Sequence, residues 1–211
     1  MKRFEIITEA DARVLDIGAT VELAPGGIVT PLAKDTLAAR RVTVIGAHTV
    51  DVSTADLAPA ADIRRVVIGS DHTGLELKAH LVQHLRGKGL AVTDVGTSTT
   101  EAVDYPDIAA AVALPVARGE AEAGIVIDGA GIGSAIAANK VRGVRAAMCP
   151  DETIARYSRE HNGTNVIALG STLLAHDKAV RILEVWLGTP MREARYIRRL
   201  AKIEKLEERE C

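Results

Sequence analysis

One stretch near the middle of the chain, residues 125–140, limits the folds that this sequence can adopt. It begins with Ile125–Ile127, an apolar β-branched run with the length of a buried strand, and Asp128 follows it. Glycine then occupies every second position up to Gly133, and a helical pattern begins at Ser134. In a strand, glycine loop and helix of this kind, bare N–H groups and the positive end of the helix dipole can bind an anion. The alternative is a tight turn that needs glycine only for its backbone angles.

The composition indicates a cytoplasmic protein with an aliphatic core. Apolar residues make up 47% of the 211 residues but aromatic residues only 2%, so the core has to be built from Ala, Val, Ile and Leu, as in buried parallel sheets. The net charge of −2 offers no broad surface for nucleic acid or a membrane, and no apolar run has transmembrane length. The acidic start of the chain is unlike a signal peptide. Two cysteines, Cys149 and Cys211, fit a reducing compartment and argue against a disulfide framework or a cysteine-based metal site.

From residue 64 onward, strand and helix patterns alternate. The expected strands are Val66–Gly69, Leu90–Val95, Ile125–Ile127, Val144–Cys149 and Asn165–Leu169. The expected helices are Leu75–Lys88, Asp107–Arg118, one that starts at Ser134, Asp151–Glu160, His176–Leu187 and Met191–Glu210. Repeated strand–helix units predict a parallel sheet with helices on both faces. Ligands of such folds bind at the carboxyl ends of the strands, so we expect Asp71, His72, Asp128 and the glycine loop to lie along one edge.

Residues 1–50 differ from the rest and predict a small α+β extension. A mixture of Ala, Pro, Ser and Asp at residues 51–62 indicates a linker, so the second domain spans residues 63–211. The elements expected in the extension are a strand at Thr20–Leu23, a turn at Pro25–Gly27, a helix at Leu32–Arg41 with Thr30 as its N-cap and Pro31 in its first turn, and a strand at Val42–Ile45.

Five segments of the second domain occur together in a known order and spacing: GSDHTGLELK (69–78), DYPDIA (104–109), GAGIGSAIAANKVRGVRAA (129–147), REHNGTNVIALGS (159–171) and ARYIRRLAKIE (194–204). With them, residues 64–211 resemble the ribose-5-phosphate isomerase B family, which also contains the galactose-6-phosphate isomerase subunits. The resemblance implies a Rossmann-like three-layer α/β/α sandwich that forms a homodimer or homotetramer. It also implies isomerisation of an aldose phosphate to a ketose phosphate, with no metal and no cofactor.

This reaction needs a base and hydrogen-bond donors. Moving a carbonyl between C1 and C2 of a sugar requires a group that takes a carbon-bound proton and donors that hold the enediolate oxygen. In the family the glycine loop binds the reacting end of the sugar, so the N–H groups of Gly129–Ser134 match these donors. His161 matches the residue that opens the sugar ring, a step that suits histidine; a helix C-terminal cap is the alternative. Asp71 and His72 match a pair that contacts ring hydroxyls and phosphate, with a polar turn as the alternative.

The remaining site residues also come from the resemblance. Arg195 and Arg199 lie four positions apart on one face of the last helix and match phosphate-binding arginines, which in the family reach across a dimer interface, as does the position of His161. A solvated basic face is the alternative. The catalytic residues are thus Asp128, His161 and Asp71. The substrate-binding residues are His72, Tyr105, Gly129, Ala130, Gly131, Gly133, Ser134, Asn139, Lys140, Asn162, Arg195 and Arg199.

Several positions depart from the family pattern. The commonest base of the family is a cysteine at the position of Asp128, and a subset has glutamate at the position of Ser134 instead. A threonine of many members is Ala130 here, a phosphate-contacting arginine is Thr172, and a histidine is Tyr196.

We therefore expect Asp128 to replace the cysteine as the base, because no other acidic side chain lies in the loop and serine cannot act as a base unaided. An unperturbed aspartate pKa of about 3.9 is low for a base, so burial against the apolar loop would have to raise it. The alternative is that Asp128 only bonds a sugar hydroxyl. Asp128 would then resemble the corresponding residue in the A-type subunit of galactose-6-phosphate isomerase, which works only with a B-type partner.

The extension and the loop each suggest another hypothesis. Residues 18–45 resemble a short element of the ethanolamine-utilisation corrinoid adenosyltransferases, which suggests a bacterial microcompartment and contact with its shell or cargo; an accessory β-hairpin and helix on the oligomer surface is the alternative. Besides an isomerase and a non-catalytic sugar-phosphate-binding subunit, we consider a dinucleotide-binding domain, for which Asp151 would be the acidic residue after the next strand. The loop lacks the GxGxxG spacing and follows an internal strand, which disfavours that third function.

Overall fold

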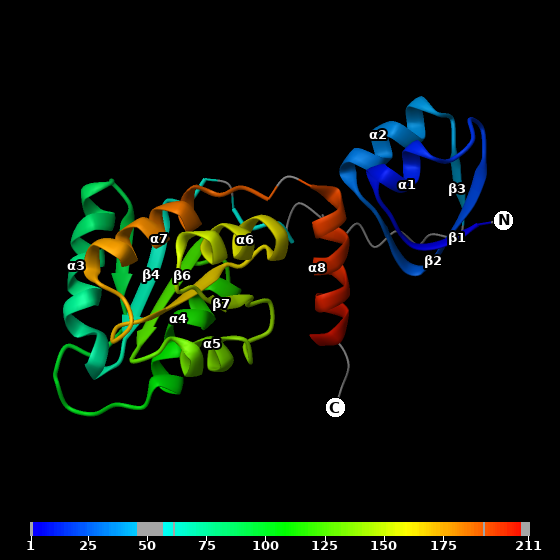
Figure 1. Ribbon diagram of the computed structural model, residues 1–211. Coiled ribbons are helices and arrows are strands. Elements are labelled where there is room, and N and C mark those ends of the chain that lie inside the picture. The colour runs from blue at the N-terminus through cyan, green and yellow to red at the C-terminus, as the bar shows by residue number, and fades with distance from the viewer. Residues whose placement is uncertain (1, 46–56, 61, 192, 208–211) are drawn as a thin grey trace. The chain divides into compact units, whose positions relative to one another are not determined.

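The computed structural model describes residues 2–45, 57–60, 62–191 and 193–207. The contacts of the chain divide it into two compact units: Pro59–Met191 forms the larger one, and Met1–Ala58 with Arg192–Cys211 forms the smaller one. Both contain helices, and each has a sheet (Figure 1). In the described part of the chain, no helix has both the length and the apolar character needed to cross a membrane.

The larger unit is built on a five-stranded sheet in which all paired strands are parallel. Its strands are β4 (Arg65–Ser70), β5 (Ala91–Asp94), β6 (Ala123–Asp128), β7 (Ala146–Met148) and β8 (Val166–Gly170). Their order across the sheet is β5-β4-β6-β8-β7. At its centre Ile68 pairs with Ile125, which pairs with Ile167, and all three are fully buried. Burial on both faces explains why the middle residues of these three strands are apolar.

Helices cover both faces of this sheet (Figure 1). One face carries α3 (Leu75–Gly87), α6 (Glu152–Asn162) and α7 (His176–Gly188), and the other carries α4 (Tyr105–Ala117) and α5 (Ile132–Ala138). Leucine and isoleucine fill the first layer together with the fully buried Trp186, whereas valine and alanine fill the second. The predicted fold class, a Rossmann-like three-layer α/β/α sandwich with a parallel sheet, is confirmed.

Helix α4 begins two residues earlier than predicted, at Tyr105 instead of Asp107. Asp104 is its N-cap, so Pro106 lies in the first helical turn and not in a preceding turn. Backbone N–H groups of the first turn have no acceptor within the helix, and proline is therefore tolerated there. The other helix and strand ends of this unit, including those of the short strand β7, lie within two residues of the prediction.

The smaller unit contains a second parallel sheet, of order β1-β2-β3. Its elements follow in the order β1 (Arg3–Ile7), α1 (Glu9–Arg13), β2 (Thr20–Val29), α2 (Pro31–Ala39) and β3 (Thr43–Ile45). This strand–helix–strand arrangement contradicts the β-hairpin that we considered, and β1 and α1 were not predicted. The predicted N-cap of α2 is confirmed, because Thr30 Oγ1 accepts a hydrogen bond from Ala33 N–H at 3.3 Å.

The turn predicted at Pro25–Gly27 is wrong, because β2 continues through it. Phe4 pairs with Leu23 and Ile6 with Ile28, so β2 advances by five residues where β1 advances by two. The extra residues of β2 form a bulge, which is a position in a sheet where proline and glycine are tolerated.

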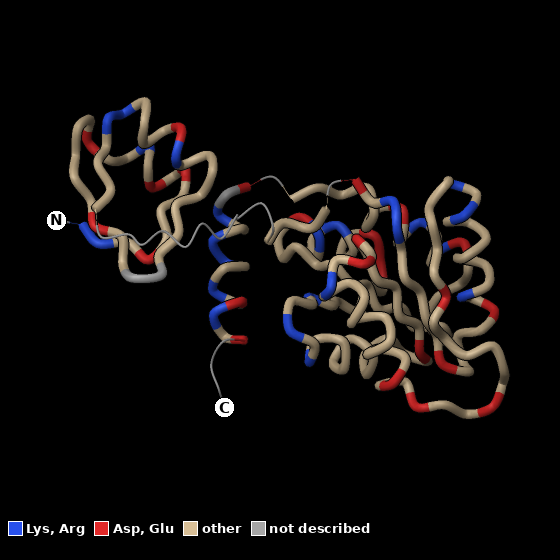
Figure 2. The backbone as a smooth tube through the Cα atoms, turned by 180° about the vertical axis from the view of Figure 1, so that it is seen from behind, with Lys and Arg blue, Asp and Glu red and all other residues tan. Residues whose placement is uncertain are grey.

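The last helix, α8 (Ala194–Glu207), confirms the helix predicted from residue 191. Lys and Arg recur along it, with Glu near its end (Figure 2). Residues 192 and 208–210 of the predicted helix lie outside the described residues, as do residues 51–56 and 61 of the predicted linker.

Candidate active site

The site candidates come together where the strand order of the larger sheet reverses. From β4 the chain moves to β5 on one side and later to β6 on the other, so the carboxyl ends of β4 and β6 lie at a topological switch point, where ligands of such sheets bind. Asp71 directly follows β4, and its N–H donates to Ile127 O at 3.1 Å. Asp128 is the last residue of β6. As predicted, both carboxylates and the glycine loop lie at this edge.

The glycine loop rests on the backbone at the end of β8. Gly131 has a φ of 77°, which disfavours any side chain, and a Cβ there would lie 3.0 Å from the backbone of Leu169. A Cβ on Gly170 would in turn lie 2.8 Å from Ala130 O. Only glycine at both positions allows the two backbones to approach this closely. This close packing against the end of β8 fixes the position of the loop, and α5 starts directly after it.

The carboxylate of Asp128 turns back into this loop. Its Oδ1 accepts hydrogen bonds from Ala130 N–H at 2.8 Å and from Gly131 N–H, and its Oδ2 accepts one from Ser134 N–H at 2.9 Å. The residue is buried, with 5% of its surface exposed. Three donors that the sequence assigns to the substrate thus bind a side chain of the protein itself.

These hydrogen bonds decide the direction of the pKa shift. Burial alone would raise the pKa of Asp128, but the nearby Ser134 hydroxyl and hydrogen bonds from the N–H groups of Gly131, Ser134 and Ala130 stabilise the charged form more, and the pKa is lowered. Within the described residues the Ser134 hydroxyl makes no bond of good geometry, so we attribute the lowering to the N–H groups. The condition that burial would have to raise this pKa is therefore not met.

Three further predicted residues lie at the same edge. Asp71, 6% exposed, caps the short helical turn η1 (His72–Gly74), where its Oδ1 accepts from Thr73 N–H at 2.9 Å and from Thr73 Oγ1 at 2.6 Å. His72 Nδ1 accepts from Val103 N–H at 3.3 Å, just ahead of α4. The ring of Tyr105 lies over the glycine loop, because a Cβ on Gly133 would be 2.6 Å from Tyr105 Cζ.

Three hydroxyl residues that the sequence analysis did not assign to the site tie its loops together. Thr73 Oγ1 lies 3.3 Å from Ser171 Oγ, and Ser171 Oγ lies 3.1 Å from Asp128 O, to which it donates. Thr172 Oγ1 donates to Gly129 O at 2.6 Å. The sequence could have indicated these residues only by their position, because each hydroxyl lies within three residues of the carboxyl end of β4 or β8, in SDHTG and GST.

The structure does not bring four other candidates to this edge within one chain. Asn139 and Lys140 follow α5, and Asn139 Oδ1 accepts from Ala146 N–H at 2.8 Å, at the amino end of β7. His161 and Asn162 end α6, which starts at the carboxyl edge and runs back across the sheet. The ring of His161 stacks on Tyr157 with centroids 4.7 Å apart.

The two predicted phosphate ligands lie on α8, which belongs to the smaller unit. The guanidinium groups of Arg195 and Arg199 lie 4.7 Å and 5.6 Å from the ring centroid of Tyr196. Arg195 also pairs with Glu193, with Nε and Oε2 2.6 Å apart. The helix thus presents two exposed cations beside one aromatic ring, and a solvated basic face stays the alternative.

A family model described as Ribose/Galactose Isomerase matches residues 66–203. The chain belongs to this family. It is 42% identical over 147 residues to ribose-5-phosphate isomerase B of Escherichia coli K12, an alignment that covers 70% of this chain and 99% of the relative. The solved structure of Clostridium thermocellum ribose-5-phosphate isomerase B is 44% identical with a TM-score of 0.67, over 68% of this chain and 97% of the other. Ribose-5-phosphate isomerase B from Mycoplasma genitalium with bound ribulose-5-phosphate is 36% identical with a TM-score of 0.67, over 69% and 97% of the two chains.

In this ribose/galactose isomerase chain, no described cysteine can take the place of Asp128. Cys149 follows β7 and is fully buried in the core. Burial, with a small contribution from Asp151, raises the pKa of its thiol to about 11, although a hydrogen bond to Ser158 opposes this. Cys211 lies outside the described residues. No group of three His, Cys, Asp or Glu side chains in the described parts of the chain is arranged to hold a metal ion.

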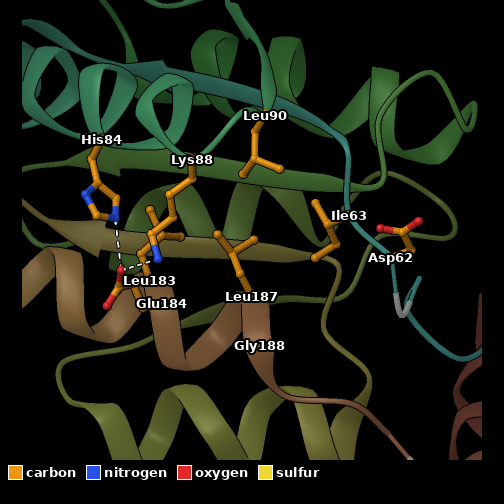
Figure 3. Close-up of a pocket in the computed structure, with 9 residues that line it drawn as sticks. All are labelled: Asp62, Ile63, His84, Lys88, Leu90, Leu183, Glu184, Leu187 and Gly188. Carbon is orange, nitrogen blue, oxygen red and sulfur yellow. Dashed lines mark ion pairs between the residues drawn. The ribbon is translucent and has the colours of Figure 1, made fainter.

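A pocket of about 360 Å³ lies elsewhere on the larger unit, between the ends of α3 and α7 and beside the residues that precede β4 (Figure 3). His84 and Lys88 both point at Glu184, whose Oε1 is 3.2 Å from His84 Nε2 and 2.5 Å from Lys88 Nζ. Leu90, Leu183 and Leu187 line the pocket beside them (Figure 3). Because these residues neighbour the amino end of β4, the pocket is separate from the candidate site.

The close packing of the glycine loop against Gly170 can be tested by mutation. Gly170→Ala should lower the stability of the larger unit by roughly 1–3 kcal/mol, because its Cβ would press on the backbone of Ala130. Gly87→Ala is the matched control: nothing lies within 4 Å of its Cβ, and it ends helix α3, so it should leave stability unchanged or raise it slightly. Urea unfolding of both variants measures the difference. Equal midpoints would show that the loop does not need this close approach.

Proposed function

We propose that the chain is an aldose–ketose isomerase of a sugar phosphate, of the type that interconverts ribose 5-phosphate and ribulose 5-phosphate through an enediolate. The observation that carries the proposal is a buried carboxylate on a glycine loop at the reversal of strand order, in a chain 42% identical to an Escherichia coli ribose-5-phosphate isomerase B. The bound ribulose-5-phosphate of the Mycoplasma genitalium relative supports this class of substrate.

In this proposal Asp128 carries the proton between C2 and C1. In the structure, its carboxylate accepts hydrogen bonds from the N–H groups of Ala130, Gly131 and Ser134. An open-chain sugar that places its carbonyl oxygen in the loop competes for the same donors. As the carboxylate loses these donors its charged form is less stabilised and its pKa rises, which makes it a better base. The donors meanwhile hold the oxygen on which the enediolate charge develops.

The roles that we propose for the other site residues depend on how close each residue lies to the carboxyl edge of the sheet. Asp71, His72 and Tyr105 lie at the same edge and would contact sugar hydroxyls. Asn139 and Lys140, at the far end of α5, lie away from this edge and are the weakest of the proposed contacts.

His161 and Asn162 are at the far end of α6, so they would complete the site of a second copy, with His161 opening the sugar ring. This supports a homodimer or homotetramer with shared sites. Sedimentation that finds only monomers in an active preparation would contradict it.

We further propose that residues 1–50 form a separate small domain, joined by the linker at 51–62 to the isomerase domain at 63–211, although the contacts of the chain group the last helix of that domain, α8, with residues 1–58. The extension has its own sheet and its own buried core, which supports this division. We also propose that the protein is cytoplasmic and lies inside a bacterial microcompartment, where the extension would contact shell or cargo; the resemblance of residues 18–45 to a short element of the ethanolamine-utilisation corrinoid adenosyltransferases supports this. Deleting residues 1–60 should leave an oligomer that binds sugar phosphate; an aggregated product would contradict the division.

The function is tested with the purified full chain alone and a panel of aldose and ketose phosphates, followed by NMR. Conversion of ribose 5-phosphate to ribulose 5-phosphate supports the proposal. Binding without turnover of any member of the panel would instead identify a non-catalytic subunit, and binding of a dinucleotide but no sugar phosphate would overturn the proposal altogether.

Removing the proposed base gives the next prediction. Asp128→Asn keeps the shape of the side chain but cannot take a proton, so kcat for ribose 5-phosphate should fall by at least ~10²-fold. Binding of the sugar phosphate, measured by calorimetry, should remain. Ser158→Ala, which removes a buried hydroxyl near Cys149, is a control for small losses of stability. Normal turnover by the Asp128→Asn variant would place the base elsewhere.

A prediction for phosphate binding follows from α8. Replacing Arg195 or Arg199 with Ala should raise KM for sugar phosphates, because a hydrogen bond to a charged group contributes roughly 1.5–3 kcal/mol. Arg198→Ala removes one arginine from the same helix but leaves both contacts with Tyr196, so its KM should not change. If all three variants kept the kinetics of the original protein, the phosphate would have to bind at other residues.

A further inference from the structure

The two residues after β8 hold the start of the glycine loop in a repeated pattern. The N–H of Ser171 donates to Asp128 O at 2.8 Å and its hydroxyl to the same oxygen at 3.1 Å. The N–H of Thr172 donates to Gly129 O at 3.1 Å and its hydroxyl to that oxygen at 2.6 Å. Each of the two carbonyls thus receives two donors from one residue, which uses both lone pairs of the oxygen.

The second of these contacts sets the direction of a catalytic donor. The carbonyl of Gly129 and the N–H of Ala130 belong to one planar trans peptide, so fixing one end fixes the other in the opposite direction. The N–H of Ala130 is one of the donors to Asp128 Oδ1, at 2.8 Å. Glycine accepts many backbone angles, so the orientation of this peptide depends on the hydrogen bonds at its two ends, of which the one from the Thr172 hydroxyl, at 2.6 Å, is the shortest. The side chain of Thr172 therefore acts on the base through the peptide between them.

We propose that Thr172 is a positioning residue of the catalytic loop, whose hydroxyl orients the Gly129–Ala130 peptide so that its N–H serves first Asp128 and then the enediolate oxygen. This inference deepens the proposed isomerase function and rests on it. It assigns Thr172 a role through the backbone of the loop, where the sequence comparison suggested only the loss of a phosphate-binding cation.

Three variants of the full chain test the role. Thr172→Val keeps the shape and removes the hydroxyl; kcat for ribose 5-phosphate should fall roughly five-fold, which corresponds to one net hydrogen bond, while KM stays unchanged. Thr172→Ser keeps the hydroxyl and should restore kcat. Thr189→Val is the matched control, because Thr189 Oγ1 also donates to a backbone carbonyl, Val185 O, at 2.6 Å, but beyond the end of α7. Its kcat should equal that of the original protein.

Amide hydrogen exchange of Ala130 gives a readout that needs no turnover. Thr172→Val should speed this exchange about five-fold, and Thr189→Val should not change it. Unchanged exchange and unchanged kcat in Thr172→Val would overturn the proposal, as would a rise in KM with no change in kcat. If the original protein shows no turnover at all, the isomerase proposal fails, and the exchange of Ala130 still decides whether Thr172 orients the loop.

Discussion

The hydrogen bonds from three backbone N–H groups to the carboxylate of Asp128 are the interaction on which the rest of the site depends. The glycines of the loop have no side chains with which to hold a conformation, so the loop is fixed by what its backbone contacts. The Asp128 carboxylate accepts hydrogen bonds from the loop N–H groups. The carboxyl end of β8 packs against the loop backbone, and the two residues after β8 donate hydrogen bonds to the carbonyls of Asp128 and Gly129. The start of α5, the position of Ser134 and the path of the loop under Tyr105 all follow from these contacts.

The same interaction creates the chemical difficulty of the site. Hydrogen bonds that hold a carboxylate in place also stabilise its charged form, and here they outweigh burial and lower the pKa of Asp128. A carboxylate in that state is always ionised near neutral pH but takes up a proton poorly. In the mechanism that we propose, competition between substrate and carboxylate for the loop donors would resolve this, because the base would gain strength only when a sugar oxygen occupies the loop. Such an arrangement also costs binding energy, since the substrate has to displace a ligand that the protein supplies.

Local sequence patterns predicted the larger unit well but not the contacts between distant segments. The apolar runs around Ile68, Ile125 and Ile167 identify three central strands because burial on both faces leaves no other kind of residue. The direction of the Asp128 pKa shift could not be predicted, because it depends on where the loop N–H groups point, which residue types do not reveal. Thr172 was missed because its partner Gly129 is 43 positions away and is reached only through the pairing of β6 with β8. In the smaller unit, the bulge in β2 made a strand look like a turn.

The pH dependence of kcat/KM for ribose 5-phosphate, compared between the original protein and Asp128→Cys, tests the central claim most directly. The ratio of the two profiles cancels the titration of the substrate phosphate. If Asp128 is the base, the activity of Asp128→Cys relative to the original protein should fall as the pH is lowered, because the carboxylate stays ionised down to about pH 5, whereas a thiol, whose usual pKa of about 8.5 the same N–H groups would lower, becomes protonated at a higher pH. A constant ratio between about pH 5 and about pH 9 would show that the residue at position 128 does not carry the proton.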